Sequence, residues 1–266
     1  MKLKQYLKLY IFSSFLLGSV QLYAQGGHLI VAVMAGPELN VAKTAQQIAR
    51  QKYNLEVDLI PMLDYAAPNQ ALQGKIIDAN AYQDQGFLAQ QKRDANYRNL
   101  VVMGETFMYP MGAYSQKFHS IKEIPDNANI AIPNDPSNRG RALRLLQDYG
   151  FIHLRNPMDR TPSVDDIISN PRHLKIQQMA ANLIVPSLNQ VDVGIINNTY
   201  SALAGLYVFQ NALFSEDKNL FYKNLIVARE DNQSDPDIQH FVEAFNSPEV
   251  FHKAQEAFKN AVVKCE

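Results

Sequence analysis

Ile130–Tyr149 reads IAIPNDPSNRGRALRLLQDY and joins a short apolar run to a polar turn and a helical repeat of apolar residues. The pattern predicts a buried strand over 130–132 and a helix over 139–149. Asp135 or Ser137 can cap this helix, and the intervening proline is common in a first helical turn. A strand that leads into a helix N-terminus leaves backbone N–H groups unpaired, so this stretch suits an anion.

Arg141 is the side chain of this stretch that is best placed to act on a ligand. It lies one turn or so into the predicted helix, where its guanidinium can offer two parallel donors to a carboxylate. We expect Arg139, two residues earlier, to point elsewhere. The alternative interpretation is a well-capped helix with a surface arginine, and the stretch alone does not decide between the two.

Outward from this stretch, apolar runs with strand and helix periodicity alternate along the chain. A strand, an amphipathic helix and a second strand near the N-terminus predict a βαβ unit with a parallel sheet. A similar order restarts after residue 122, so two α/β blocks predict two lobes. The predicted strands are 28–33, 55–60, 76–81, 100–103, 107–111, 130–132, 174–176, 191–196 and 225–227, and the predicted helices are 39–53, 69–73, 139–149, 163–169 and a terminal one with Phe241, Phe245, Val250 and Phe258.

The first 24 residues have the pattern of a secretory signal peptide. Three lysines precede a mostly apolar segment at 9–20, and Ala24 supplies the small residue before the cut. The apolar segment is shorter than the roughly 20 residues that a membrane span needs. An uncleaved anchor is the alternative interpretation.

Charge and cysteine content narrow the class of protein further. The chain has 25 basic and 26 acidic side chains, and loss of residues 1–24 removes three lysines and no acid, which leaves 22 basic against 26 acidic. No basic stripe remains, so neither nucleic acid nor an anionic membrane surface is expected as a partner. The single cysteine, Cys265, allows no intrachain disulfide, and no cysteine stands near the cut to carry a lipid. We therefore expect a soluble, exported protein.

The sequence offers no catalytic or metal-binding constellation. The G-x-S-x-G, H-E-x-x-H, Walker and G-x-G-x-x-G patterns are absent, and the six histidines are scattered singly. An enzyme would need a nucleophile, a base and an orienting group, which no cluster supplies. We expect no enzymatic activity, no metal and no cofactor.

Amide and aromatic side chains beside the apolar runs suggest a binding site instead. Asn80 and Asn197 follow such runs, Asn224 precedes one, and Tyr82 and Phe87 lie just beyond Asn80. In an open α/β sheet the ligand crevice lies outside the strand ends. An amide both donates and accepts, which suits a zwitterion with amino and carboxylate groups. Taken singly, each asparagine is better explained as a turn former and each ring as core.

Six ordered motifs carry a resemblance to a known family. In their order and spacing, from about residue 29 to the C-terminus, the chain resembles the methionine-binding proteins of the NlpA family, which serve methionine ABC importers. The resemblance therefore covers essentially everything after the predicted signal peptide. The motifs are DY at 64–65 with PNQAL at 68–72, IDANAYQ at 77–83, TFMYP at 106–110, PNDPSN at 133–138 with GR at 140–141, N at 197 with TY at 199–200, and NLIV at 224–227 with REDN at 229–232.

The resemblance implies an α/β, type II-like periplasmic binding protein with two lobes. Each lobe would be a mixed sheet flanked by helices, and crossing segments near 110–114 and 203–210 would join them. The first lobe would comprise residues 25–111 plus 208–266, and the second would comprise 112–207. The implied function is to capture methionine by closing the lobes and to deliver it to the permease and ATPase of an ABC importer.

Matching the family position by position implies a site of seven ligand-binding residues. Arg141 would pair with the ligand carboxylate, and Asn138 would lie beside it. Asn197 and Asn224, one from each lobe, would hold the amino and carboxylate groups. The side-chain pocket would have aromatic walls, which suit a polarisable thioether. Either Arg141→Ala or Asn224→Ala is then expected to abolish tight methionine binding at similar thermal stability. The aromatic residues are Tyr65, Tyr82 and Phe87.

The chain departs from the family pattern at three places. It lacks the usual lipidated cysteine near the N-terminus, which implies a receptor that diffuses freely in the periplasm and meets a membrane only through its transporter. Asp84 stands where many members have a histidine, and Phe87 replaces a common tyrosine. An acid near the pocket favours ligands with an additional positive group.

These departures leave several alternatives open. The ligand can be another small zwitterion, such as a methionine-containing dipeptide or a different apolar amino acid. The chain can also be a surface interaction protein without a transport function, or an enzyme built on the same scaffold, because a fold does not fix a function.

Overall fold

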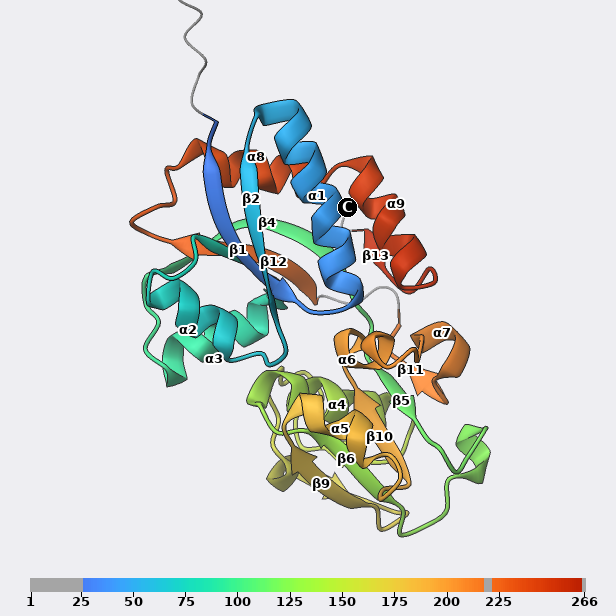
Figure 1. The fold of residues 1–266 in the computed structure, drawn as a ribbon. Helices are drawn as coiled ribbons and strands as arrows, with labels where there is room; N and C mark the ends of the chain where they lie inside the picture. Colours follow the sequence, from blue (N-terminus) through green and yellow to red (C-terminus); the bar gives the residue numbers. More distant parts are fainter. Residues whose placement is uncertain (1–25, 218–221, 265–266) are drawn as a thin grey trace, which may run out of the picture.

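The computed structural model describes residues 26–217 and 222–264. Within these ranges most strands belong to two sheets, each accompanied by helices, and Figure 1 shows the two sheets in separate parts of the molecule. The two-lobed α/β architecture predicted from the sequence is confirmed. The predicted signal peptide at 1–24 and Cys265 lie outside the described residues.

The first sheet is mixed, with the strand order β13–β4–β12–β3–β1–β2. β1 runs parallel to both of its neighbours, so the predicted βαβ unit is present as β1, α1 and β2. β12 is antiparallel to β3 and to β4. The bounds are β1 (His28–Met34), α1 (Pro37–Tyr53), β2 (Glu56–Met62), β3 (Ala79–Asp84), β4 (Leu100–Met108), β12 (Lys223–Arg229) and β13 (Val263–Lys264).

Both faces of the first sheet are covered by helices, as the alternation along β1 illustrates. Leu29, Val31 and Val33 belong to the core that α1, α8 and α9 cover. Ile30 and Ala32 point to the opposite face, where they pack with residues of α2 and α3. Successive side chains of a strand point to opposite faces, so a strand covered on both sides is apolar throughout. The bounds are α2 (Ala67–Gln73), α3 (Gln85–Asp94), α8 (Pro236–Phe245) and α9 (Pro248–Ala257).

The second sheet has the strand order β11–β5–β10–β6–β9 and surrounds the stretch at 130–149. β6 is parallel to β9 and β10, and β5 is antiparallel to β10. Ile130 and Ile132 pack with α4 on one face, while Ala131 packs with α5 on the other. The predicted strand, turn and helix are therefore confirmed. The bounds are β5 (Gly112–Tyr114), β6 (Asn129–Pro133), α4 (Pro136–Asp148), β9 (Lys175–Met179), α5 (Ala181–Ser187), β10 (Val193–Ile196) and β11 (Phe214–Ser215).

The chain passes from the first sheet to the second between Met108 and Gly112, close to the first expected crossing. The second expected crossing, at 203–210, is not the last point at which the chain contributes to the second sheet. β11, which follows it, still pairs with β5 of that sheet. A strand of two residues leaves no periodicity in the sequence, so this pairing could not be anticipated. Two short helices lie in the intervening stretch, and the lobe boundaries at 111 and 207 stay predictions. These helices are α6 (Asn198–Leu203) and α7 (Val208–Asn211).

Two predicted elements in the middle of the chain differ from the structure. The strand expected at 76–81 begins three residues later, because Lys75 has a φ of 60° and the Asp78 carboxylate accepts the backbone N–H of Ile30, which holds this segment in a turn. The helix expected at 163–169 is wrong. Ser163 and Asp166 close a single 3₁₀ turn with their side chains, and β8 (Ile167–Ser169) then pairs with β7 (His153–Leu154).

Two further predictions concern the number of elements. The strands expected at 100–103 and 107–111 are one strand, β4, whose pairing with β12 shifts register twice. The terminal helix is two helices, because Ser247 and Pro248 begin α9 anew after α8 ends. The four apolar residues predicted for it are nonetheless all buried in the core of the first lobe. No helix in the described part of the chain has the length and apolarity that crossing a bilayer requires.

Candidate functional site

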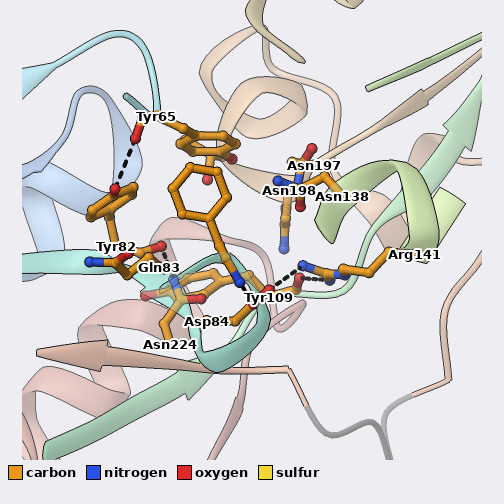
Figure 2. Close-up of a pocket in the computed structure, with 12 residues that line it drawn as sticks. Tyr65, Tyr82, Gln83, Asp84, Tyr109, Asn138, Arg141, Asn197, Asn198 and Asn224 are labelled. Atoms are coloured by element: carbon orange, nitrogen blue, oxygen red, sulfur yellow. Dashed lines mark hydrogen bonds and ion pairs between the residues drawn. The ribbon is translucent and has the colours of Figure 1, made fainter. Parts of the chain in front are cut away.

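A small cavity lies between residues of the two lobes. The atom-free space in it and at its open mouth together is about 370 Å³, so it admits at most a small molecule. All seven residues predicted to bind a ligand line it, and Figure 2 shows how those that it labels converge. The lining residues are Tyr65, Tyr82, Gln83, Asp84, Phe87, Tyr109, Asn138, Arg141, Asn197, Asn198, Thr199 and Asn224.

Strand ends and helix beginnings position these side chains. In the first lobe Tyr82 and Asp84 come from the carboxyl end of β3, and Phe87 from the first turn of α3. In the second lobe Asn197 directly follows β10, and Arg141 lies on α4 after β6. The cavity therefore lies where an open α/β sheet is expected to bind its ligand, beyond the carboxyl ends of strands.

The beginning of α4 resolves the alternatives left by the sequence. Asp135, and not Ser137, is the N-cap, and its carboxylate accepts the backbone N–H of Asn138 at 2.9 Å. Asn138 and Arg141 are three residues apart and so share one face of the helix, the one that lines the cavity. Arg139 does not line the cavity, as predicted, and its Nε donates to the carbonyl of Pro162 at 3.3 Å.

The Arg141 guanidinium is already held by groups of the protein. Its Nε and Nη2 donate to the two carboxylate oxygens of Glu216 at 3.0 and 2.7 Å, and Nη2 also donates to the carbonyl of Tyr109 at 3.2 Å. Nη1 lies 3.5 Å from Oδ2 of Asp84. Because Glu216 occupies the two-donor edge, Nη1 is the nitrogen with donor capacity left for a ligand carboxylate.

These three ionised groups are almost completely buried. The side chains of Arg141, Asp84 and Glu216 are 5–6% exposed. Burial by itself lowers the pKa of Arg141, but the charges of Glu216 and Asp84 and the hydrogen bonds to Glu216 outweigh it and raise this pKa above its ordinary value. The Tyr222 ring covers the guanidinium, with its centroid 4.3 Å from the central carbon. One positive and two negative groups thus meet at this end of the cavity.

A chain of amides beside Arg141 has a fixed direction. The Asp135 carboxylate accepts from Nδ2 of Asn138 at 3.1 Å, which turns Oδ1 of Asn138 toward Asn197. Nδ2 of Asn197 donates to that oxygen at 2.6 Å. A carboxylate can only accept, so the order of donors and acceptors cannot be reversed.

Two neighbouring amide oxygens, one at the end of this chain and one beside it, lack partners. Oδ1 of Asn197 is buried without a hydrogen bond, and so is Oδ1 of Asn198, whose Nδ2 donates to the carbonyl of Ala261 at 3.2 Å. Buried polar atoms are nearly always paired, so each such exception needs an explanation. Both residues line the cavity, which makes a ligand donor the natural missing partner.

Asn224 and Asp84 lie side by side on the first-lobe wall. They are opposite each other on the antiparallel strands β12 and β3. Nδ2 of Asn224 donates to the carbonyl of Tyr82 at 2.7 Å. Oδ1 of Asp84 caps α3 by accepting the backbone N–H of Phe87 at 2.9 Å. Each side chain is thus anchored by one atom and keeps another for the cavity.

The opposite end of the cavity is aromatic. Tyr65, Tyr82 and Phe87 form a triangle with ring centroids 5.9–6.0 Å apart. Tyr200 adds a fourth ring, 4.9 Å from that of Tyr65. The Tyr82 hydroxyl donates to the backbone carbonyl of Tyr65 at 2.8 Å, which holds the Tyr82 side chain against the segment that carries Tyr65. The three predicted aromatic residues therefore do form one wall.

Asn80 has a different role from the one that its place beside an apolar run suggested. It lies inside β3, completely buried, and does not line the cavity. Its Nδ2 donates to Asn69 and its Oδ1 accepts from Gln83, and these two amides also bond to each other. This closed cluster ties α2 to β3 and is structural.

Sequence reasoning passed over several residues at or near the cavity. Glu216 is 75 positions from Arg141 in the chain, so no local pattern reveals their pairing. Thr199 lines the cavity and donates its hydroxyl to Glu38 of α1. Burial raises the pKa of Glu38 to about 7, although the hydrogen bond from Thr199 opposes the shift. Among the described residues, no three His, Cys, Asp or Glu side chains gather as a metal site would require.

Comparisons with known proteins agree with this geometry. The model of the NlpA lipoprotein family matches residues 29–265. The D-methionine-binding lipoprotein MetQ of Escherichia coli O157:H7 is 42% identical over 257 residues, which cover 94% of each chain. The crystal structure of the methionine binding protein MetQ has a TM-score of 0.87 at 42% identity and covers 90% of this chain and 98% of its own. A nutrient binding protein from Burkholderia cenocepacia bound to methionine has a TM-score of 0.86 at 36% identity, with coverages of 90% and 100%.

The same comparisons correct the expected localisation. The matching family is one of lipoproteins, and the Escherichia coli relative is named a lipoprotein. The expectation of a soluble receptor that diffuses freely after cleavage is therefore wrong. It treated the lack of a cysteine near residue 25 as decisive.

The family match spans nearly all of the described chain, and every motif on which the resemblance rested lies within it. The sheets, the cavity between the lobes and the ordered motifs lead to one conclusion. The chain belongs to the NlpA lipoprotein family.

Proposed function

We propose that this protein is the substrate-binding component of an ABC importer and captures methionine between its two lobes. The observation that carries the proposal is the composition of one cavity. A buried arginine and several amides lie at one end, and three aromatic rings lie at the other. A relative named for D-methionine binding and a structural neighbour solved with methionine support the same ligand.

Each end of the cavity suits one part of the ligand. Nη1 of Arg141 would bind the carboxylate, with Asn138 and Asn224 beside it, and Asn197 would meet the amino group. The rings of Tyr65, Tyr82 and Phe87 would enclose the side chain, because a polarisable thioether packs favourably against aromatic edges.

Lobe closure would couple binding to transport. The ligand contacts residues from both lobes, so it favours the closed form over the open one by its differential affinity. An interaction between the lobes is available to stabilise that form, because the backbone N–H of Ser137 on α4 donates to the Gln90 side chain on α3 at 3.2 Å. The closed protein would then present both lobes to a permease and its ATPase.

The protein would act without catalysis. None of the twelve described residues around the cavity is a histidine or a cysteine. The hydroxyl of Thr199, which lines the cavity, donates its hydrogen to the carboxyl group of Glu38.

Isothermal titration calorimetry with L-methionine, D-methionine, leucine and a methionine-containing dipeptide tests the proposal. We expect a methionine enantiomer to bind most tightly and in a 1:1 ratio. Preference for the dipeptide or for leucine would identify another zwitterion as the ligand. No heat with any of the four, together with no co-purified small molecule in native mass spectrometry, would favour a surface interaction protein.

A further inference from the structure

The acidic residue Asp84 is not explained by its contacts within the protein. Oδ1 caps α3, but Oδ2 has only a long contact of 3.5 Å with Nη1 of Arg141. The charge of that arginine is already balanced by Glu216 at 2.7 Å. A carboxylate accepts about four hydrogen bonds, so Asp84 keeps acceptor capacity and a negative charge in a nearly buried place.

The second-lobe wall of the same cavity also presents acceptors. The order Asp135, Asn138, Asn197 forces Oδ1 of Asn197 to the end of the chain without a partner. The carbonyl of Ala261 accepts from Nδ2 of Asn198 and so fixes the orientation of this amide, whose Oδ1 has no partner. Two amide oxygens without hydrogen bonds and a carboxylate with only a long contact to a cation suit a cationic group with several N–H donors.

We propose that Asp84 is the counter-ion of the ligand's α-ammonium group, assisted by Oδ1 of Asn197, so that this cavity selects ligands with a free amino group. The proposal rests on the proposed function and deepens it. It makes Asp135 a positioning residue, because that carboxylate sets the direction of the Asn138 and Asn197 amides.

The spacing of the charged groups supports this assignment. The ammonium and carboxylate groups of an α-amino acid are attached to one carbon, so their binding partners must be neighbours. Oδ2 of Asp84 and Nη1 of Arg141 lie 3.5 Å apart, as this requires, and come from different lobes. The ammonium contributes three donors, enough for Asp84 and at least one of the orphan amide oxygens.

The test compares methionine with two analogues in the intact protein by calorimetry. 4-(Methylsulfanyl)butanoate lacks the amino group, and N-acetylmethionine has it neutralised. We expect the wild type to prefer methionine over each analogue by about 100-fold or more, since a site built around a buried charge rejects a ligand that leaves it unpaired.

The variant Asp84→Asn removes the charge and keeps a side chain that still caps α3. We expect it to lose about 10- to 100-fold in methionine affinity while its affinity for the butanoate stays within a factor of about 3. Asp135→Asn should reduce the preference for methionine over the butanoate by a smaller factor. An amide at 135 can donate as well as accept, so the Asn138 and Asn197 amides can then reverse their orientation. The matched control is Asp58→Asn, the same substitution on the exposed strand β2, which should leave all three affinities unchanged.

Two outcomes separate the inference from the function on which it rests. If the wild type binds methionine and the butanoate equally well, or if Asp84→Asn binds methionine as tightly as the wild type, Asp84 is not the counter-ion and the methionine-binding function stands. If the wild type binds methionine no better than leucine, the proposed function itself fails.

Discussion

Two clusters of buried asparagine and glutamine lie within the same protein and behave differently. In the first, Asn69, Asn80 and Gln83 bond to one another in a closed network between α2 and β3. In the second, Asn138 and Asn197 form an open chain that ends on an unpaired oxygen at the cavity. Both clusters are built from side-chain amides, so what distinguishes a structural amide from a ligand-binding one is whether its last acceptor finds a partner inside the protein.

Arg141 tests this comparison with the largest expected effect, because it lines the cavity although most of its donors are already used. Arg141→Ala leaves the buried carboxylates of Glu216 and Asp84 without their cation, which should lower the free energy of unfolding by about 3–5 kcal/mol and also abolish tight methionine binding. Urea denaturation and calorimetry measure the two effects. The sequence-based expectation of unchanged thermal stability is thereby revised. Arg139→Ala is the control, and an equal loss of stability there would contradict the assignment.

Glu38 adds a titratable group to the comparison, because it accepts from the hydroxyl of Thr199, two residues after Asn197 of the open chain. Its pKa is raised by burial to about 7, so the native state keeps a proton that the unfolded chain releases near 4.5. The free energy of unfolding should therefore fall as the pH rises from about 4.5 to about 7, by an amount on the order of 3 kcal/mol for this group. Thermal denaturation of Glu38→Gln across this range should show a flatter pH dependence than the wild type. Parallel curves would disprove the role of Glu38.

The closed cluster should affect stability and not binding. Asn80→Ala removes one buried hydrogen bond each from Asn69 and Gln83, which we expect to cost about 2 kcal/mol of unfolding free energy. Methionine affinity of the folded variant should stay within about 3-fold of the wild type, because Asn80 does not line the cavity and Gln83, which does, stays bonded to Asn69. A large loss of affinity without a loss of stability would break the comparison.

The open chain should show the opposite behaviour and the smallest change in stability. Asn197→Ala removes an oxygen that has no partner and one hydrogen bond, from its Nδ2 to Asn138, so the free energy of unfolding should fall by about 1 kcal/mol, less than for Asn80→Ala. Methionine affinity should fall by about 10- to 100-fold, because a hydrogen bond to a charged group is lost. Calorimetry and denaturation on the same preparation decide the matter. Asn80→Ala serves as the matched control, with the two effects reversed.

The sequence predicted the regular elements wherever periodicity was long. The helix after residue 135 and the strand at 130–132 follow from apolar spacing and cap chemistry, because these act between residues close in the chain. Errors arose where side chains from elsewhere decide the local conformation. The turn before β3 is one case, since the Asp78 carboxylate holds it through the backbone of Ile30, 48 positions away.

By itself, the sequence determined which residue types are available to bind a zwitterion and the order of the motifs that carry them. Tertiary structure alone decided which of those residues share a cavity and which donors remain free. It placed Asn80 in a closed structural cluster and Asn197 at the cavity. It also paired the two-donor edge of the Arg141 guanidinium with Glu216. The reason is physical: a hydrogen bond depends on distances of about 3 Å between groups that the chain places tens of residues apart, and no local pattern encodes that distance.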